Sequence, residues 1–221
     1  MSAAVAHGDP ARAALDAYAG LGRGDRFHVA VRWRSCPFPA VDAAVPRTGR
    51  VLDVGCGHGL FPLYLAATSP GRKVVGVDVD AAKLVSARRA AEASGLPVTF
   101  EAEPPAGPWD AITIVDVLYL LGEEAALDLL GRLAVTLAPG GVLVVKEVDV
   151  RPRWKYRITR WQEIVSTRVT RITEGTGVAF VHPAAIDRAL TDAGLFVTRR
   201  ALGKGSLHPH LLLVGRRGEA A

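Results

Sequence analysis

The chain has 221 residues, of which 49% are hydrophobic and 22% charged, and its formal net charge at pH 7 is +5. This composition is typical of a soluble globular protein, and the length favours a single domain over residues 1–221. The chain contains no apolar run near the roughly 18 residues of a membrane span and no N-terminal signal pattern, so we expect a cytoplasmic protein without a transmembrane segment. The two cysteines lack C-x-x-C spacing, so neither a metal site nor a disulfide framework is predicted.

Short apolar runs alternate with helical patterns along the chain, which is typical of an α/β fold. Strands are predicted at residues 51–54, 74–77, 98–100, 111–115 and 142–148. Helices are predicted at residues 60–68, 81–93, 123–137 and 183–192. Two last strands, 195–200 and 211–214, have only a short turn between them and should form an antiparallel hairpin. We therefore expect a doubly wound, mostly parallel seven-stranded sheet with an antiparallel edge strand and helices on both faces.

The stretch VLDVGCGHG, residues 51–59, takes a buried strand into a glycine-rich turn. In a doubly wound sheet, ligands bind beyond the carboxyl ends of the strands, where this turn lies. Glycines accept positive φ and carry no Cβ, so a ligand can lie against the backbone and meet its N–H groups. A dinucleotide fingerprint, G-x-G-x-x-G from Gly55, would need glycine at position 60, where the chain has Leu60.

Four stretches together resemble one family, the class I S-adenosylmethionine-dependent methyltransferases. VLDVGCGHG is similar to the first motif of that family and VVGVDVD (74–80) to the second. WDAITIVDVLYLL (109–121) is similar to the fourth motif, and LAPGGVLVVKE (137–147) to the proline-glycine turn into the fifth strand. The resemblance covers residues 45–149 and implies S-adenosylmethionine as the cofactor.

The resemblance also implies roles for individual residues at the methionine and ribose parts of the cofactor. Gly55 and Gly57 would lie against the methionine part, and Asp53 would orient the loop or accept from the methionine amino group. Asp78 would accept both ribose hydroxyls, which suits a carboxylate with its two oxygens. Asp116, at the end of the fourth strand, would face the methionine part on the substrate side.

The adenine side departs from the family pattern. Val79 would pack on the adenine face. The family often carries a glycine-aspartate pair after the third strand that reads the adenine amino group, whereas this chain has FEAEPPAGPWD. Glu101 is expected to replace it, with Glu103 as the alternative.

Methyl transfer from a sulfonium depends chiefly on alignment and on exclusion of water, so a catalytic base is optional. Glu147, Tyr119 and His182 are the candidate catalytic residues. Glu147 is the best placed, since the carboxyl ends of parallel strands converge on the site. For His182 a structural role is the competing interpretation, and Tyr119 is equally consistent with a core position.

Two segments outside the common sheet mix aromatic and basic residues, 24–46 and 151–180, and both are candidate parts of a substrate lid. Between Arg151 and Arg171 seven basic residues face one acid. This charge suits a small or lipid-like acceptor with an acidic group, as in secondary metabolism or lipid tailoring. The alternatives are a solvated helix face, an RNA methyltransferase that uses 151–171, and a cofactor-binding protein without catalysis; nucleic acid is the less favoured partner. The sequence sets neither the acceptor nor the oligomeric state.

Overall fold

The computed structural model of the protein describes residues 9–148, 181–202 and 210–219. The predicted insertion 151–180 and the turn between the last two strands therefore lie outside the described residues. Within the described ranges, no helix is long and apolar enough to cross a membrane.

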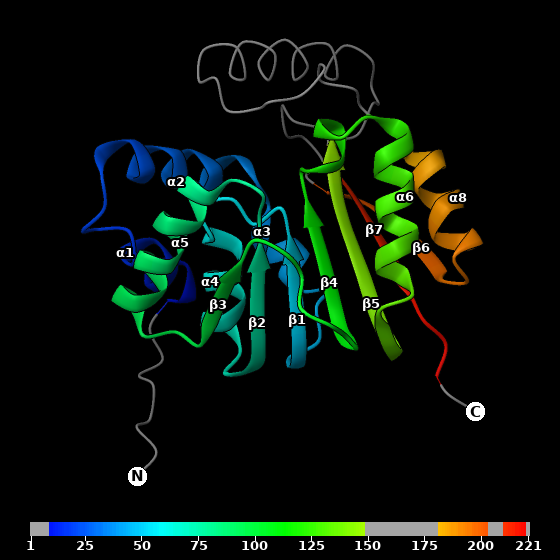
Figure 1. Cartoon of the computed structure of the whole chain (residues 1–221), viewed down its shortest axis with the longest axis horizontal. Helices are drawn as coiled ribbons and strands as arrows, with labels where there is room; N and C mark the ends of the chain where they lie inside the picture. Colours follow the sequence, from blue (N-terminus) through cyan, green and yellow to red (C-terminus); the bar gives the residue numbers. More distant parts are fainter. Residues whose placement is uncertain (1–8, 149–180, 203–209, 220–221) are drawn as a thin grey trace.

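One seven-stranded sheet, in the order β3-β2-β1-β4-β5-β7-β6, runs through the molecule (Figure 1). Its strands are β1 (Thr48–Val54), β2 (Gly71–Val77), β3 (Val98–Glu101), β4 (Trp109–Val115), β5 (Leu137–Val148), β6 (Phe196–Leu202) and β7 (His210–Arg216). The first five strands pair in parallel, and β7 is antiparallel to both β5 and β6. The predicted fold class and the terminal hairpin are confirmed. The reversed strand β7 lies next to β5, so the β6–β7 pair forms that edge of the sheet.

Helices cover both faces of this sheet. They are α1 (Pro10–Asp16), α2 (Arg23–Ser35), α3 (Phe38–Asp42), α4 (Leu60–Thr68), α5 (Ala81–Ser94), α6 (Glu123–Ala134) and α8 (Pro183–Asp192), with a 3-10 turn η1 (Leu118–Leu120) before α6. Buried side chains of α1 to α5 form one hydrophobic cluster with one face of the sheet, and those of α6 and α8 form a second cluster with the other face. The sheet is therefore the middle layer of three.

Local signals explain most of the element boundaries. The side chain of Asp80 accepts from the N–H groups of Ala82 and Lys83 and so caps α5, and Gly95 ends that helix with φ +65°. Both were expected from the sequence. Helix α4 and helix α8 also have their predicted bounds.

The end of α6 and the start of β5 differ from the sequence prediction, and both differences have a tertiary cause. Helix α6 ends at Ala134 instead of residue 137, because Leu137 already pairs with Trp109 of β4. The next paired residue of β5 is Val142 opposite Ala111, so the predicted proline-glycine turn forms an irregularity inside β5. In addition, helices α1 to α3 were not predicted.

The order of the strands sets where a ligand can bind. β1 pairs with β2 on one side and with β4 on the other, so the chain changes direction across the sheet at this strand. The loops that follow β1 and β4 leave the sheet at its carboxyl edge towards opposite faces, which opens a crevice there.

A buried arginine ties α3 to the sheet at the opposite edge, where β2 begins. Arg72 in β2 is 1% exposed and forms an ion pair with Asp42 of α3. Its guanidinium also donates to the carbonyl oxygens of Leu65, Val45 and Pro46. The arrangement satisfies a charge that would otherwise be costly to bury.

We expect Arg72→Met to lower the free energy of unfolding by about 3 to 5 kcal/mol, because it leaves buried acceptors without a donor. Arg47 pairs with the same Asp42 carboxylate, but its side chain is 57% exposed. Arg47→Met is therefore the matched control and should cost less than about 1 kcal/mol. Urea denaturation measures both values, and equal losses would show that burial of Arg72 is not what stabilises this region.

Candidate active site

The predicted site residues gather at the carboxyl edge of the sheet. Asp53 lies near the end of β1, the glycine loop follows that strand, Asp78 follows β2, and Asp116 follows β4. Glu147 lies near the end of β5, and the parallel pairing of these strands brings all of these ends to one edge. The site is thus assembled from segments far apart in the sequence.

The glycine loop is bound to the end of β2. The N–H groups of Gly55 and Cys56 both donate to the carbonyl oxygen of Val77, at 2.8 and 2.9 Å. The N–H of Gly57 donates to a carboxylate oxygen of Asp78 at 2.7 Å. The expectation that these N–H groups face a ligand was therefore wrong: they hold the loop against its neighbouring strand.

The three glycines of the loop differ in what surrounds them. A Cβ at Gly55 would lie 2.4 Å from Val117, and one at Gly59 would lie 2.5 Å from Phe100, so these two positions are glycine for packing. Gly57 has φ +55°, and a Cβ there would meet nothing within 4 Å. Of the two glycines expected to lie against the methionine part of the cofactor, Gly57 therefore has open space beside its backbone, whereas Val117 fills that space at Gly55.

Asp78 connects this open space to the start of α5. Its second carboxylate oxygen accepts from the N–H of Asp80 at 2.9 Å. Each oxygen thus has one backbone donor and keeps a lone pair for a further donor, which fits a ligand that offers two hydroxyl groups. Val79, next in the chain, is 97% exposed, and such exposure of a valine leaves an apolar surface for a flat ring. Glu101 is also exposed, and its carbonyl oxygen accepts from the N–H of Asp78.

Asp53 lies behind the loop. It is 3% exposed and accepts from the Thr113 hydroxyl at 2.6 Å, across the β1–β4 pair. Burial raises the pKa of Asp53 to about 7, although the Thr113 hydroxyl acts in the opposite direction. Its observed contact joins the two strands that flank the crevice, which is consistent with the loop-orienting role in the sequence prediction.

Asp116 is held between two cations. It has φ +57°, is 9% exposed, and its carboxylate pairs with Lys146 at 2.5 Å and with Arg32 at 2.6 Å. Burial alone would raise the pKa of Asp116, but Lys146 and Arg32 together lower it below its ordinary value. The second terminal nitrogen of Arg32 donates to the Val115 carbonyl oxygen at 3.0 Å, which fixes the end of β4.

Neither cation was predicted as a site residue. Lys146 is 1% exposed within an apolar strand, and a lysine in such a run is a visible signal that a buried anion lies nearby. Arg32 gives no comparable signal, because it lies 84 positions before its partner on a helix that was not predicted.

Glu147 supports the turn after β4. One carboxylate oxygen accepts from the N–H groups of Val117 and Leu118, at 3.0 and 2.9 Å. The side chain is buried, and burial together with the Asp116 carboxylate raises the pKa of Glu147 to about 8. Its contacts are those of a residue that positions η1, while a pKa near neutrality is also what a base would need. The catalytic role stays a prediction.

The other two candidate catalytic residues lie on different elements, Tyr119 in η1 and His182 at the start of α8. Tyr119 is half-buried in η1, the turn that Glu147 holds. His182 is exposed, and its Nδ1 accepts from the N–H of Ala184 at 3.1 Å, so it caps α8. The described contacts bring Tyr119 and Glu147 to one segment and give His182 a local structural role. The catalytic roles of Tyr119 and His182 stay predictions.

Helix α2 covers the glycine loop. The carboxylate of Asp25 lies 3.5 Å from Nε2 of His58, and the rings of His28 and His58 are 4.5 Å apart. The hydroxyl of Tyr18 donates to the carbonyl oxygen of His58 at 2.6 Å. Burial lowers the pKa of His28 to about 4 and lowers that of His58 as well, so the two rings meet as neutral groups at pH 7.

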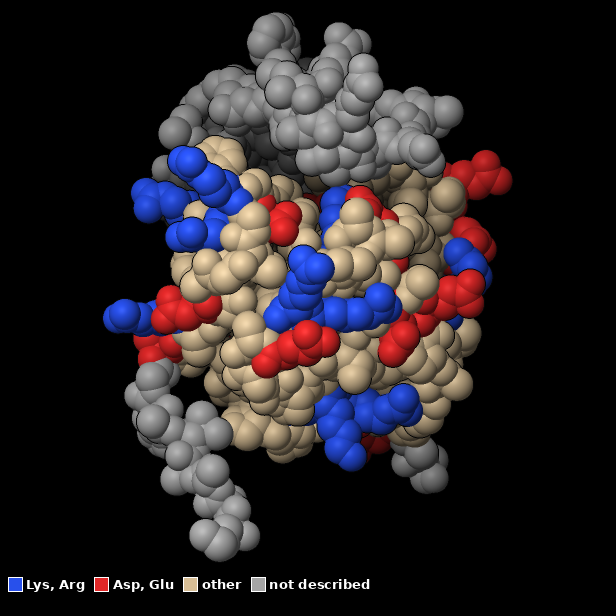
Figure 2. Space-filling model, turned by 60° about the vertical axis from the view of Figure 1, so that its left-hand side comes forward, with Lys and Arg blue, Asp and Glu red and all other residues tan. Residues whose placement is uncertain are grey.

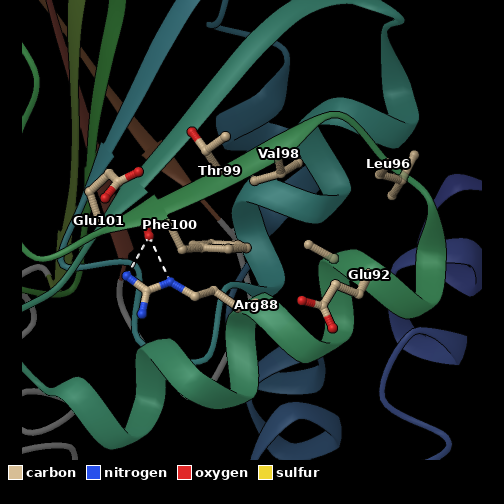
Figure 3. Close-up of a pocket in the computed structure, with 8 residues that line it drawn as sticks. Arg88, Glu92, Leu96, Val98, Thr99, Phe100 and Glu101 are labelled. Atoms are coloured by element: carbon tan, nitrogen blue, oxygen red, sulfur yellow. Dashed lines mark hydrogen bonds between the residues drawn. The ribbon is translucent and has the colours of Figure 1, made fainter.

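A separate surface hollow lies between β3 and α5 (Figure 3). Arg88 reaches across it and donates from Nε and a terminal nitrogen to the carbonyl oxygen of Phe100, at 2.9 and 2.7 Å. Of the predicted site residues, Glu101 alone is among those that line it. The hollow is therefore distinct from the crevice at Gly57.

Known methyltransferases are similar to this chain in sequence and in fold. A family model described as a methyltransferase domain matches residues 32–199. Demethylmenaquinone methyltransferase of Thermus thermophilus is 41% identical over 135 residues, which are 58% of this chain and 59% of that protein. Ubiquinone biosynthesis O-methyltransferase of Psychrobacter arcticus is 33% identical over 155 residues, 66% of this chain and 58% of that protein. The chain thus spans less than two thirds of the length of these curated relatives.

Among solved structures, an O-methyltransferase family protein from Burkholderia thailandensis has the same fold, with a TM-score of 0.71 at 20% identity. The match covers 90% of this chain and 59% of that one.

The pKa of Glu147 gives a test of the site through stability. A carboxyl group whose folded-state pKa is raised, here from 4.5 to about 8, contributes stability at low pH that is lost as the pH rises through the folded-state value. Between about pH 5 and pH 8 the unfolding free energy of the wild type should therefore fall relative to Glu147→Gln, by up to about 1.4 kcal/mol per pH unit.

Urea denaturation across this pH range measures the difference, and Glu92→Gln, at an exposed position on α5, is the control that should follow the wild type. If the unfolding free energies of the wild type and Glu147→Gln change in parallel with pH, the buried Glu147 carboxyl does not carry a proton in the folded protein below about pH 8.

Proposed function

This chain belongs to the methyltransferase-domain family, that of the class I S-adenosylmethionine-dependent methyltransferases, and on this premise we propose what it does. It transfers a methyl group from S-adenosylmethionine to a small or lipid-like acceptor that carries an acidic group. The observation that carries the proposal is the pair formed by Asp78 and Gly57, a bidentate acceptor beside open space on the glycine loop.

The described residues fit the cofactor. Asp78 would accept the two ribose hydroxyls, since each of its oxygens keeps a free lone pair. The exposed side chain of Val79 would cover one face of the adenine, with Glu101 beside it. The methionine part would enter the space beside Gly57 and approach Asp116 at the end of β4.

The charges around Asp116 support an anionic acceptor. Two cations, Arg32 and Lys146, share one carboxylate, which leaves an excess of positive charge in a largely buried place. Such an excess favours an acidic hydroxyl or carboxylate in its ionised form and lowers its pKa. Arg32 comes from segment 24–46, one of the two segments expected to contribute to substrate binding.

The chain then needs to do little chemistry itself. When bound, S-adenosylmethionine supplies a methyl group that its sulfonium charge has already activated. The protein orients the two reactants and covers them with α2, which excludes water, and alignment of this kind is worth roughly 7 to 11 kcal/mol. An acceptor held as its anion by Arg32 loses no proton during transfer, so no base is required.

One relative supports an acceptor with a hydroxyl group. The Psychrobacter protein is named an O-methyltransferase of ubiquinone biosynthesis, whereas the name of the Thermus protein does not say which atom is methylated. A ring hydroxyl ionises near pH 10 when unperturbed, within reach of a site that lowers its pKa by nearby cations. We therefore favour a hydroxylated ring over a carboxylic acid as the acceptor.

The ribose assignment predicts the effect of Asp78→Asn. The amide keeps the shape of the side chain but loses one acceptor oxygen, so binding of S-adenosylmethionine and S-adenosylhomocysteine should weaken by about 1 to 3 kcal/mol each. Calorimetry measures both, with Asp128→Asn, an exposed position on α6, as the control. Unchanged affinity for both ligands would remove Asp78 from the ribose site.

The acceptor assignment predicts the effect of Arg32→Gln. Loss of a charge-assisted contact to the acceptor oxygen should lower kcat/KM for hydroxylated ring compounds by about 10- to 100-fold. The rise of kcat/KM with pH should also move to higher pH, because the acceptor then ionises with less help. Arg89→Gln, on the exposed side of α5, is the matched control.

A uniform loss of rate at every pH would instead mean that Arg32 only supports Asp116. Calorimetry with S-adenosylmethionine on the same variant shows whether the cofactor site has stayed intact.

A further inference from the structure

Helix α2 has two faces of different character. Its inward side chains reach the site, Asp25 towards His58 and Arg32 towards Asp116. On its outward face, Phe27 is 73% exposed and Val31 is 47% exposed. These two residues are four positions apart and are therefore neighbours on the helix surface. The helix runs over the carboxyl edge of the sheet (Figure 1), so this apolar pair points away from the site.

Arginines flank the apolar pair. Arg23, Arg26 and Arg34 of α2 are exposed, and at 3.6 residues per turn Arg23 and Arg34 fall beside Phe27 on the outward face. Asp25, the acidic residue of the helix, turns inward and accepts from the Ser86 hydroxyl at 2.9 Å. Figure 2, which brings the side of α1, α2 and α5 forward, shows basic side chains gathered at the upper left of the coloured surface. The outward face of α2 thus joins cations with exposed apolar groups and has no acid of its own.

The chemistry of this face narrows what can cover it. The insertion between Arg151 and Arg171 has seven basic residues and one acid, so its charge has the same sign as that of α2. A nucleic acid would pair with the arginines but would leave Val31 without an apolar partner. A bilayer with anionic headgroups offers both negative charge and an apolar layer beneath it, which is the environment that basic amphipathic surface helices prefer.

We propose that the outward face of α2, formed by Arg23, Arg26, Phe27, Val31 and Arg34, docks on the surface of an anionic lipid bilayer. Phe27 and Val31 enter the headgroup region, and the arginines contact lipid phosphates. Two apolar side chains give weak, reversible association rather than anchoring. The site on the inward side of α2 then lies about one helix diameter, roughly 10 Å, from the bilayer.

Docking in this position would bring the site close to a lipid-like acceptor, and this part of the inference rests on the proposed function. A lipid-like acceptor is concentrated in the bilayer, and a site one helix away from its surface receives such an acceptor without a long path through water. The docking itself depends only on the outward face of α2.

Vesicle sedimentation tests the proposal. The full chain is mixed with vesicles of phosphatidylcholine alone or of phosphatidylcholine with phosphatidylglycerol, and we expect binding only to the anionic vesicles. Arg23→Gln with Arg34→Gln should weaken this binding by about 25-fold, at about fivefold for each arginine near the surface. Phe27→Ser with Val31→Ser should weaken it by about tenfold, because the apolar contribution is lost.

The matched control removes the same charge from other faces. Arg89→Gln with Arg132→Gln, at exposed positions on α5 and α6, should change vesicle binding by less than about twofold. All four changed positions on α2 are exposed, so unfolding curves of these variants should coincide with that of the wild type.

Four results would overturn the docking proposal. They are no binding of the wild type to anionic vesicles, an equal loss in the control variant, an unchanged affinity of the Phe27→Ser, Val31→Ser variant, and self-association through this face in place of vesicle binding. Binding of S-adenosylmethionine, measured by calorimetry on the same samples, separates this proposal from the proposed function. A wild type that fails to bind the cofactor refutes the function and leaves the vesicle result standing.

Discussion

The bond between the Asp78 carboxylate and the N–H of Gly57 is the interaction on which the site depends. It fixes the glycine loop against β2, and the other carboxylate oxygen fixes the N–H of Asp80 and with it the start of α5. Because Gly55 and Gly59 are packed against Val117 and Phe100, the loop opens at Gly57 alone of the three. One side chain therefore shapes the loop, orients the helix behind it and presents two oxygens to the open space.

A second feature, helix α2, connects this loop to Asp116 at the end of β4. Asp25 and His28 meet His58 inside the glycine loop, while Arg32 pairs with Asp116 at the end of β4. The helix thus contacts the loop after β1 and the end of β4, the two borders of the crevice. Any displacement of α2 would loosen both at once, so order in the cofactor site and order around Asp116 are physically linked. The same helix separates the site from the surface that we assign to a bilayer.

The fold could be predicted from sequence because its signals are local. Apolar runs, the cap at Asp80 and the glycine turn at 51–59 act within a few residues, and they gave the strands and the helices α4, α5 and α8. The end of α6 could not be placed, because the pairing of Leu137 with Trp109 decides it from 28 positions away. Long-range geometry also decides how the loop uses the N–H groups of Gly55, Cys56 and Gly57, which bind the end of β2 and Asp78.

The site residues that were not predicted also depend on contacts between residues far apart in the sequence. Helix α2 has one buried apolar residue, Val29, beside the polar contacts of Asp25 and Arg32, so periodicity did not reveal the helix, and Arg32 stayed hidden with it. Lys146 was visible as a charge in an apolar strand, and asking for its buried partner would have led to Asp116. Glu147 was placed correctly at the carboxyl edge, but its hydrogen bonds to Val117 and Leu118 follow from a turn that sequence cannot orient.

A structure of the protein with S-adenosylhomocysteine tests the central claim most directly. The account predicts ribose hydroxyls within hydrogen-bond distance of both Asp78 oxygens, adenine against Val79, and the space beside Gly57 filled by the amino-acid part of the ligand. A ligand bound elsewhere, or an adenosine that leaves Asp78 without a hydroxyl partner, would contradict it.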